Sequence, residues 1–294
     1  QLNGEIVAMT GDGVNDAPSL KAADIGVAMG TGVDVAKQAA DMILADDNFA
    51  TIEKAIEEGR GVYENIRKSV IFLLSSNLGE LMTMFVAVAM GLASPLKSSH
   101  ILWINLITDS LPALALGVDK NDSKSLMRCP PRKASESLFA RGGIACTLFY
   151  GALITVIGLA AFLVLPCGIL AAEGELVGNP FTWVERLREL MSREQILAKS
   201  QTYAFTVLGM CQLYHAIGMR DVQKSVFAMS PRDNLLMVAA CIIGFILQFA
   251  VTEIPFLIRA FGTSHLSGQE WLLLSVLAAF PLFAHEVIVL FTKN

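Results

Sequence analysis

The stretch SVIFLLSSNLGELMTMFVAVAMGLA, residues 69–93, decides the fold class of this chain. Glu80 is its single charged side chain. A helix needs about 20 predominantly apolar residues to cross the hydrocarbon core of a bilayer, and this stretch is long enough. We therefore expect a membrane-spanning helix here.

Five further apolar stretches follow it, at about 101–118, 142–165, 202–219, 234–251 and 271–290. Of the 294 residues, 54% are hydrophobic and 17% are charged, and the mean hydropathy is +0.55. So apolar a chain has more hydrophobic surface than one soluble core can bury. The sequence predicts a mainly α membrane protein with six transmembrane helices, in contact with a lipid bilayer. The net charge of -5 lacks the basic excess needed for phosphate backbones, so we do not expect a nucleic-acid partner.

The first 50 residues have a different pattern. Short apolar runs at about 5–10, 25–29 and 42–46 alternate with helical patterns at 17–23 and 33–40. This alternation predicts part of a parallel α/β sheet. Since neither an initiator Met nor a signal-type stretch opens the chain at Gln1, we interpret it as a fragment whose upstream part completes this domain.

Residues 51–68 are expected to form a stalk helix between the soluble and membrane parts. Ile52, Ile56, Ile66 and Val70 recur at helical spacing, and no proline interrupts the pattern. The expected domains are therefore 1–50, the stalk 51–68 and the membrane domain 69–294.

Basic residues are distributed unevenly over the flanks of the six spans. Thirteen flank one side: Arg60, Arg67, Lys68, Lys120, Lys124, Arg128, Arg132, Lys133, Arg141, Arg220, Lys224, Arg232 and Lys293. Six flank the other: Lys97, Arg186, Arg188, Arg193, Lys199 and Arg259. The positive-inside rule then predicts that the soluble part and the C-terminus are cytoplasmic.

The first candidate site is TGDGVNDAP, residues 10–18, at the carboxyl end of the first expected strand. Open parallel sheets bind ligands at this edge. Asp12 and Asp16 provide hard oxygen donors of the kind that Mg²⁺ prefers. Asn15 or Asp16 could instead cap the helix that begins near Pro18, and the residues alone leave both interpretations open.

The second candidate site consists of polar side chains within the first two spans, where such groups are expensive and usually functional. They are Asn77, Glu80, Asn105, Thr108 and Asp109. Their i, i+3 and i+4 spacings place them together, and Pro112 has no N–H to give to the Thr108 carbonyl. Oxygen ligands with two carboxylates predict a hard-cation site of the Ca²⁺ type. The alternative is polar contact between helices, which explains two carboxylates poorly.

The stretch TGDGVNDAPSLKAADIGVAMG, residues 10–30, resembles the hinge segment of P-type ion-pumping ATPases and the fourth acidic motif of the haloacid dehalogenase superfamily. The resemblance implies a Rossmannoid phosphorylation domain that is represented here by its C-terminal part. It also implies that Asp12 and Asp16 hold Mg²⁺, and that Asn15 and Asp16 act on the phosphorylated aspartate and its attacking water.

SSNLGE, residues 75–80, and WINLITDSLPALALG, residues 103–117, resemble the fifth and sixth membrane helices of type II pumps, the sarcoplasmic reticulum type and its bacterial relatives. The resemblance implies that Asn77, Glu80, Asn105, Thr108 and Asp109 bind transported Ca²⁺ in an ATP-driven translocase with an aspartyl-phosphate intermediate. The DKTGT motif of the nucleophile does not occur in these 294 residues, so we expect this fragment alone to be inactive.

One departure concerns the eighth membrane helix, where two-site calcium pumps have a glutamate. Alignment through residues 206–211 places Gly209 there, which favours a single transported ion. Gln212, about one turn on, is either a neutral ligand or an interhelical contact.

Three alternatives stay open: a pump for Mn²⁺, Na⁺ or H⁺, a non-catalytic membrane protein that retains the fold, and a membrane-tethered phosphatase. No retention signal follows Phe291, and we expect a prokaryotic plasma membrane.

Overall fold

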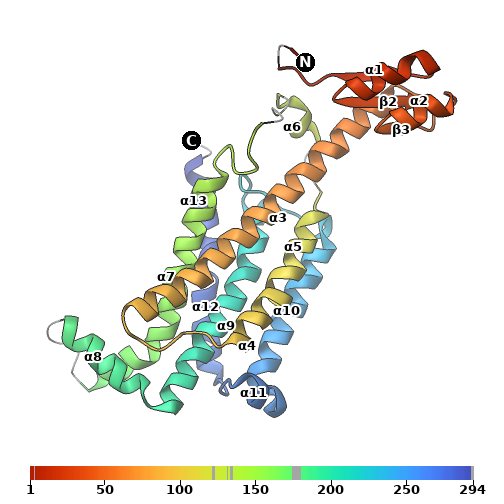
Figure 1. Cartoon of the computed structure of the whole chain (residues 1–294). Coiled ribbons are helices and arrows are strands. Elements are labelled where there is room, and N and C mark those ends of the chain that lie inside the picture. Colours follow the sequence, from red (N-terminus) through yellow and green to blue (C-terminus); the bar gives the residue numbers. More distant parts are fainter. Residues whose placement is uncertain (3, 121–122, 131, 133–134, 174–179, 293–294) are drawn as a thin grey trace. The chain divides into compact units, whose positions relative to one another are not determined.

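A computed structural model of the chain describes residues 1–2, 4–120, 123–130, 132, 135–173 and 180–292 (Figure 1). Lys133 and Lys293, two of the flanking basic residues, lie outside the described residues. The chain divides into two compact units. The first comprises Gln1–Glu64 and Asn121–Ala140, and the second comprises Asn65–Lys120 and Arg141–Asn294.

The first unit contains a parallel sheet of β1 (Ala8–Gly11), β2 (Ile25–Met29) and β3 (Met42–Leu44), in that order. The 3-10 helix η1 (Val14–Asp16) and helix α1 (Ala17–Ala22) connect β1 to β2, and α2 (Asp34–Ala39) connects β2 to β3. Leu20, Val27 and Leu44 form its buried apolar core. The predicted alternation of strand and helix is confirmed.

Helix α3 (Ala50–Ala89) is continuous over 40 residues, so the helical pattern predicted from residue 51 joins the first apolar stretch without a break. At its start, the Ala50 N–H donates to the side-chain oxygen of Asn48 at 3.0 Å. In the first unit, the Arg60 guanidinium donates to the carbonyls of Leu126 and Cys129, at 2.8 and 2.9 Å, at the end of α6 (Ser123–Arg128).

The second unit is a helical bundle around α9 (Glu194–Met219), which packs against α7 (Gly143–Ala172), α10 (Leu235–Glu253), α12 (Gly268–Ala278) and α13 (Phe280–Thr292) (Figure 1). From Ser200 to Met219, every residue of α9 except Tyr214 and Ile217 is buried. The remaining elements are α4 (Ser98–Trp103), the π-helical segment η2 (Ile104–Asp109), α5 (Ser110–Gly117), α8 (Pro180–Met191), η3 (Val226–Ala228), η4 (Pro231–Asp233) and α11 (Pro255–Phe261).

Among the described residues, four helical stretches are long and apolar enough to cross a membrane: Ala50–Ala89, Gly143–Ala172, Leu235–Glu253 and Gly268–Phe291. They coincide with four of the six predicted spans. The other two predicted spans, at 101–118 and 202–219, are helical but are not among these four helices. Segment 98–117 changes helix type at η2, and α9 is so enclosed by other helices that it tolerates glutamines and threonines.

Candidate functional site

The turn after β1 is held by Asp16. One of its carboxylate oxygens, Oδ2, accepts the backbone N–H groups of Asp12 and Gly13 at 3.0 and 2.9 Å. A β-carbon on Gly11 would lie 2.5 Å from that of Asp16, so the turn requires glycine there. Asp12 and Asn15 are exposed at this edge of the sheet. The turn therefore brings Asp12, Asn15 and Asp16 together. Asp16 binds the backbone that precedes it and makes no side-chain hydrogen bond to the described residues at the start of α1, so the helix-capping alternative for Asp16 is wrong.

Aspartates also close other loops of this unit. Asp24 accepts the Val7 N–H at 2.9 Å, Asp46 accepts the Thr51 hydroxyl at 2.7 Å, and Asp47 accepts the Thr31 hydroxyl at 2.6 Å. These donors favour the ionised carboxylates and hold the pKa values of Asp24, Asp46 and Asp47 below the usual range. The N–H groups of Gly13 and then Asp12 lower the pKa of Asp16 in the same way.

The lowered pKa of Asp16 predicts acid sensitivity of the turn. A depressed pKa stabilises the folded turn above the ordinary aspartate value of about 4, and this stabilisation is lost as the pH falls through the lowered value. Hydrogen-exchange protection of the Asp12 and Gly13 amides, corrected for intrinsic rates, should be constant near neutrality and fall in acid. In Asp16→Asn this fall should disappear; an equal fall in that variant would contradict the prediction.

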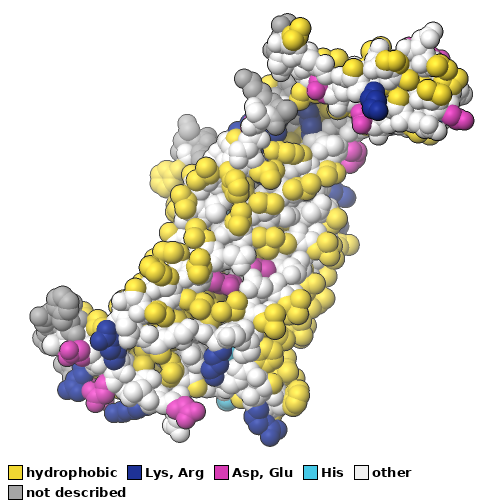
Figure 2. Space-filling model, viewed as in Figure 1, with side chains coloured by type: hydrophobic (Ala, Val, Ile, Leu, Met, Phe, Trp, Pro, Cys, Tyr) yellow, Lys and Arg dark blue, Asp and Glu magenta, His cyan; other side chains and the backbone are white. Residues whose placement is uncertain are grey.

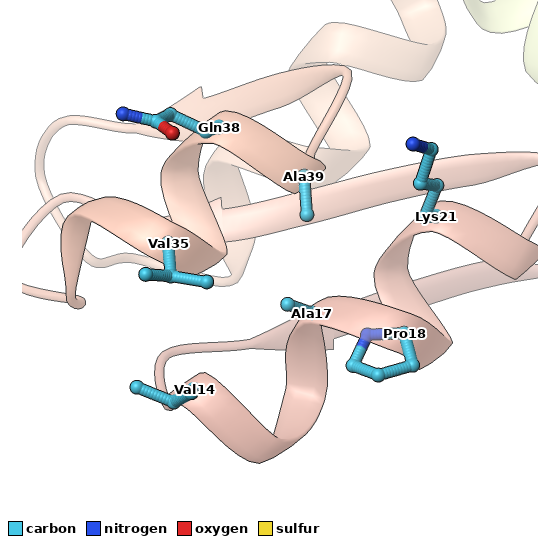
Figure 3. A pocket seen from close by; sticks show the side chains of 7 residues that line it. All are labelled: Val14, Ala17, Pro18, Lys21, Val35, Gln38 and Ala39. Atoms are coloured by element: carbon cyan, nitrogen blue, oxygen red, sulfur yellow. The ribbon is translucent and has the colours of Figure 1, made fainter.

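An open pocket lies beside this turn, between α1 and α2 (Figure 3). Its lining residues are Val14, Ala17, Pro18, Lys21, Val35, Gln38 and Ala39. The lining is largely apolar and has no carboxylate, so this pocket does not suit Mg²⁺. The predicted metal residues Asp12 and Asp16 are not part of it.

The predicted membrane site lies in the bundle of the second unit, where three residues from three elements form a hydrogen-bonded chain. The Thr108 hydroxyl in η2 lies 2.8 Å from Oε1 of Gln212 in α9 and 3.0 Å from the Ile104 carbonyl. The other end of the Gln212 amide donates to Oε1 of Glu80 in α3. Glu80 is 4% exposed, while Thr108 and Gln212 are fully buried. Gln212 thus connects the two predicted ligand helices.

Asp109 is the most unusual member of the site. It is 1% exposed, and neither carboxylate oxygen has a hydrogen-bond partner among the described residues. A buried carboxylate without a partner is costly, and such groups in membrane helices mark ion pathways. Figure 2 shows acidic side chains midway along the bundle, among hydrophobic and uncharged ones. Asp109 is therefore a buried carboxylate with both oxygens free of hydrogen bonds to the described residues.

The two asparagines lie at the margin of the site. Asn105 is half-buried and donates to the Ile101 carbonyl at 3.0 Å, and Asn77 is exposed. The spacing placed Asn77 and Glu80 on one helix face, but the residues differ by 60° around the helix axis, which suffices to separate buried from exposed. Gln212 connects Glu80 to Thr108, whereas the side chain of Asn77 is exposed.

The helix changes its hydrogen-bond pattern at the predicted ligands Asn105, Thr108 and Asp109. Residues Ile104–Asp109 form a π-helical segment, a feature that is rare and frequently found at functional sites. The Ser110 hydroxyl donates to the Asn105 carbonyl at 2.8 Å, which is one of the backbone oxygens of this segment. Sequence reasoning expected a local disturbance from Pro112 but did not predict a π-helix.

Sequence reasoning missed two groups of buried polar residues. Gln248 in α10 and Thr206 in α9 are fully buried near the site, and their side-chain polar atoms have no partners in the described part of the chain. The signal for Gln248 was available, since it is a lone amide in an apolar span. The second group is Asp119 with Arg220, a buried ion pair whose Oδ1 and Nη2 atoms lie 3.2 Å apart.

The donor set of the bundle site is hard: two carboxylates, a hydroxyl and amide oxygens. No group of three or more His, Cys, Asp or Glu side chains able to hold a metal forms in the parts of the chain that the structure describes. Carboxylates supplemented by neutral oxygens are donors that Ca²⁺ accepts, whereas soft metals prefer thiolate and thioether ligands.

Comparisons with known proteins match both parts of the chain. Residues 93–291 match the family model for the C-terminus of cation-transporting ATPases, and residues 1–56 match that of haloacid dehalogenase-like hydrolases. Calcium-transporting ATPase 1 of Bacillus cereus is 47% identical over 295 residues, which cover all of this chain and 32% of that protein. The calcium-transporting ATPase of Bacillus subtilis is 42% identical, covering 96% of this chain and 29% of that protein.

A plant relative extends the comparison to eukaryotes. The endoplasmic reticulum-type calcium-transporting ATPase 3 of Arabidopsis thaliana is 36% identical and covers all of this chain and 30% of its own length. The chain therefore spans about a third of the length of the curated relatives it matches.

Proposed function

The chain belongs to the cation-transporting ATPase family, and on that premise we propose that it is the C-terminal part of an ATP-driven pump that moves Ca²⁺ across a membrane. The observation that carries this proposal is the buried carboxylate of Asp109, whose oxygens have no hydrogen-bond partner among the described residues. With Glu80 it supplies two negative charges inside the apolar bundle. A divalent cation compensates both, which explains why the fold retains them.

The coordination shell that we propose combines Asp109 and Glu80 with neutral oxygens. Gln212 contacts both Glu80 and Thr108, while Asn105 is half-buried and Asn77 is exposed. Ca²⁺ takes six to eight oxygens, so helices from the remainder of the longer protein are proposed to cover the Asn77 side and add ligands. The exposure of Asn77 supports this, since an amide facing lipid is unfavourable.

For the first unit we propose a role in phosphoryl transfer as part of the phosphorylation domain. Its match to haloacid dehalogenase-like hydrolases and the exposed Asp12 at the carboxyl edge of β1 support this. The carboxylates of Asp12 and Asp16 suit Mg²⁺, which offsets phosphoryl charge when bound. Oδ2 of Asp16 fixes the turn, so we assign the metal to Asp12 and the other oxygen of Asp16. Asn15, exposed beside them, is proposed to contact the phosphoryl group; ATP itself binds mainly upstream.

The proposed topology has six membrane helices, which correspond to the fifth to tenth of the whole pump, with residues 1–50 and the C-terminus cytoplasmic. The distribution of basic residues supports this orientation. We propose residues 51–68 of α3 as the stalk. The two Bacillus relatives support a prokaryotic plasma membrane, and the Arabidopsis relative makes a eukaryotic reticulum membrane the alternative.

The test is phosphoenzyme formation from ATP by the full-length pump, with Ca²⁺, Mn²⁺, Na⁺ and pH varied separately. We expect phosphorylation to depend on Ca²⁺ and one Ca²⁺ to be bound per phosphoenzyme, because Gly209 supplies no third carboxylate. Two bound Ca²⁺ would contradict the single-ion proposal. Dependence on another cation would reassign the substrate, and no phosphoenzyme with any of them would favour a non-catalytic protein.

A further inference from the structure

Gln248 is a buried amide that the proposed site does not yet use. It lies in α10, is fully buried, and both its Oε1 and Nε2 atoms are without a hydrogen-bond partner in the described residues. Each of these atoms could be solvated in water, so burying them unpaired opposes folding. A group retained at this expense inside a membrane bundle points to a ligand.

This amide lies against Gly209 in the neighbouring helix α9. A β-carbon on residue 209 would lie 2.9 Å from Oε1 of Gln248 and 3.7 Å from Cγ2 of Thr108. The amide oxygen therefore approaches α9 at a residue without a side chain, and Thr108 lies beside the same residue. The same face of α9 carries Thr206, one turn earlier, whose hydroxyl is also buried and lacks a partner in the described part of the chain.

Gln248 is thus next to a residue of the proposed cation site. Thr108 is hydrogen-bonded to Gln212, which is hydrogen-bonded to Glu80, and Asp109 follows Thr108 in the chain. A cation held by these groups needs more oxygens than they provide, and an amide oxygen is a ligand that Ca²⁺ accepts. It adds coordination without adding charge, so the site keeps the two negative charges that match one divalent ion.

We propose that Gln248 is a Ca²⁺ ligand, with Oε1 reaching the cation through the space left by Gly209. The inference rests on the proposed cation transport. It makes α10 a part of the cation site, and it explains Gly209 as the residue that leaves room for the amide. A second expectation follows: without Ca²⁺ the unpaired amide destabilises the bundle, and with Ca²⁺ it stabilises it.

The experiment measures equilibrium binding of ⁴⁵Ca²⁺ and thermal unfolding of the purified full-length pump, for wild type and Gln248→Met. Methionine keeps the length of the side chain and removes the amide. We expect the Kd for Ca²⁺ to rise at least tenfold, while the unfolding midpoint in Ca²⁺-free buffer stays equal or rises. The control is Gln201→Met, which removes a buried amide that donates to the Ser94 carbonyl at 2.8 Å. It should lower the midpoint and leave the Kd unchanged.

Gly209→Ala provides an independent variant. Its β-carbon displaces the flexible end of Gln248, so the Kd for Ca²⁺ should rise. The double variant with Gln248→Met should show no further rise in Kd over Gln248→Met alone. If either single variant folds and binds Ca²⁺ with the wild-type Kd, Gln248 is not a ligand. If the wild-type pump binds no Ca²⁺, the proposed function fails instead, so the two failures are distinguishable.

Discussion

Asp109→Asn is expected to raise the Kd of the full-length pump for Ca²⁺ at least 100-fold. The carboxylate is 1% exposed and its oxygens are unpaired in the described structure, so both oxygens are available to bind the cation. Asparagine keeps the shape but removes one of two negative charges and one of two strong oxygen ligands. A 100-fold loss corresponds to about 2.7 kcal/mol, a modest value for a charged ligand in a low-dielectric site.

The measurement is ⁴⁵Ca²⁺ binding at equilibrium, with thermal unfolding in Ca²⁺-free buffer as the folding control. Since the variant removes a buried unpaired charge, its unfolding midpoint without Ca²⁺ should not fall. Asp233→Asn, which changes an exposed carboxylate in η4, is the matched control and should bind as wild type does. A Kd of Asp109→Asn within threefold of wild type would remove Asp109 from the site.

Arg220→Met is expected to lower the free energy of unfolding by about 3 to 5 kcal/mol, the usual loss when one partner of a buried ion pair is removed. The side chain of Asp119 is 2% exposed, and its carboxylate receives Arg220 at 3.2 Å and the Asn234 amide at 2.9 Å. The Asn234 amide also donates to the Ala115 carbonyl, and the Asn65 amide donates to the Asp119 carbonyl. The pair therefore joins α3, α5, α9 and α10 at one end of the bundle.

Denaturant titration of the full-length pump measures this effect. The double variant Asp119→Asn with Arg220→Met should recover at least half of the loss, because it no longer buries an uncompensated carboxylate. Arg259→Met, at an exposed arginine that donates to the Pro255 carbonyl, is the control and should change stability little. Additive effects of the two substitutions at 119 and 220 would show that the ion pair is not the cause.

Much of the architecture was predictable because it depends on local pattern. Of the six predicted spans, four coincide with helices that the structure shows to be long and apolar enough to cross a membrane, and period changes predicted the three parallel strands of the first unit. Two spans were less distinct. Helix α9 is surrounded by protein, so burial rather than lipid contact sets its composition, and π-helix formation at η2 depends on packing that no local pattern specifies.

The sequence by itself determined that Glu80, Thr108 and Asp109 are polar residues within apolar helical stretches, and that Asp12 and Asp16 share a turn after a strand. These facts follow from residue type and from spacing along one element, which helix and strand geometry fix. Only the tertiary structure decided that Gln212 connects Thr108 to Glu80, that Gln248 fills the space at Gly209, and that Asp119 pairs with Arg220. The reason is physical: these partners are 39 to 132 residues apart, and the rotation of each helix about its axis is set by packing against its neighbours.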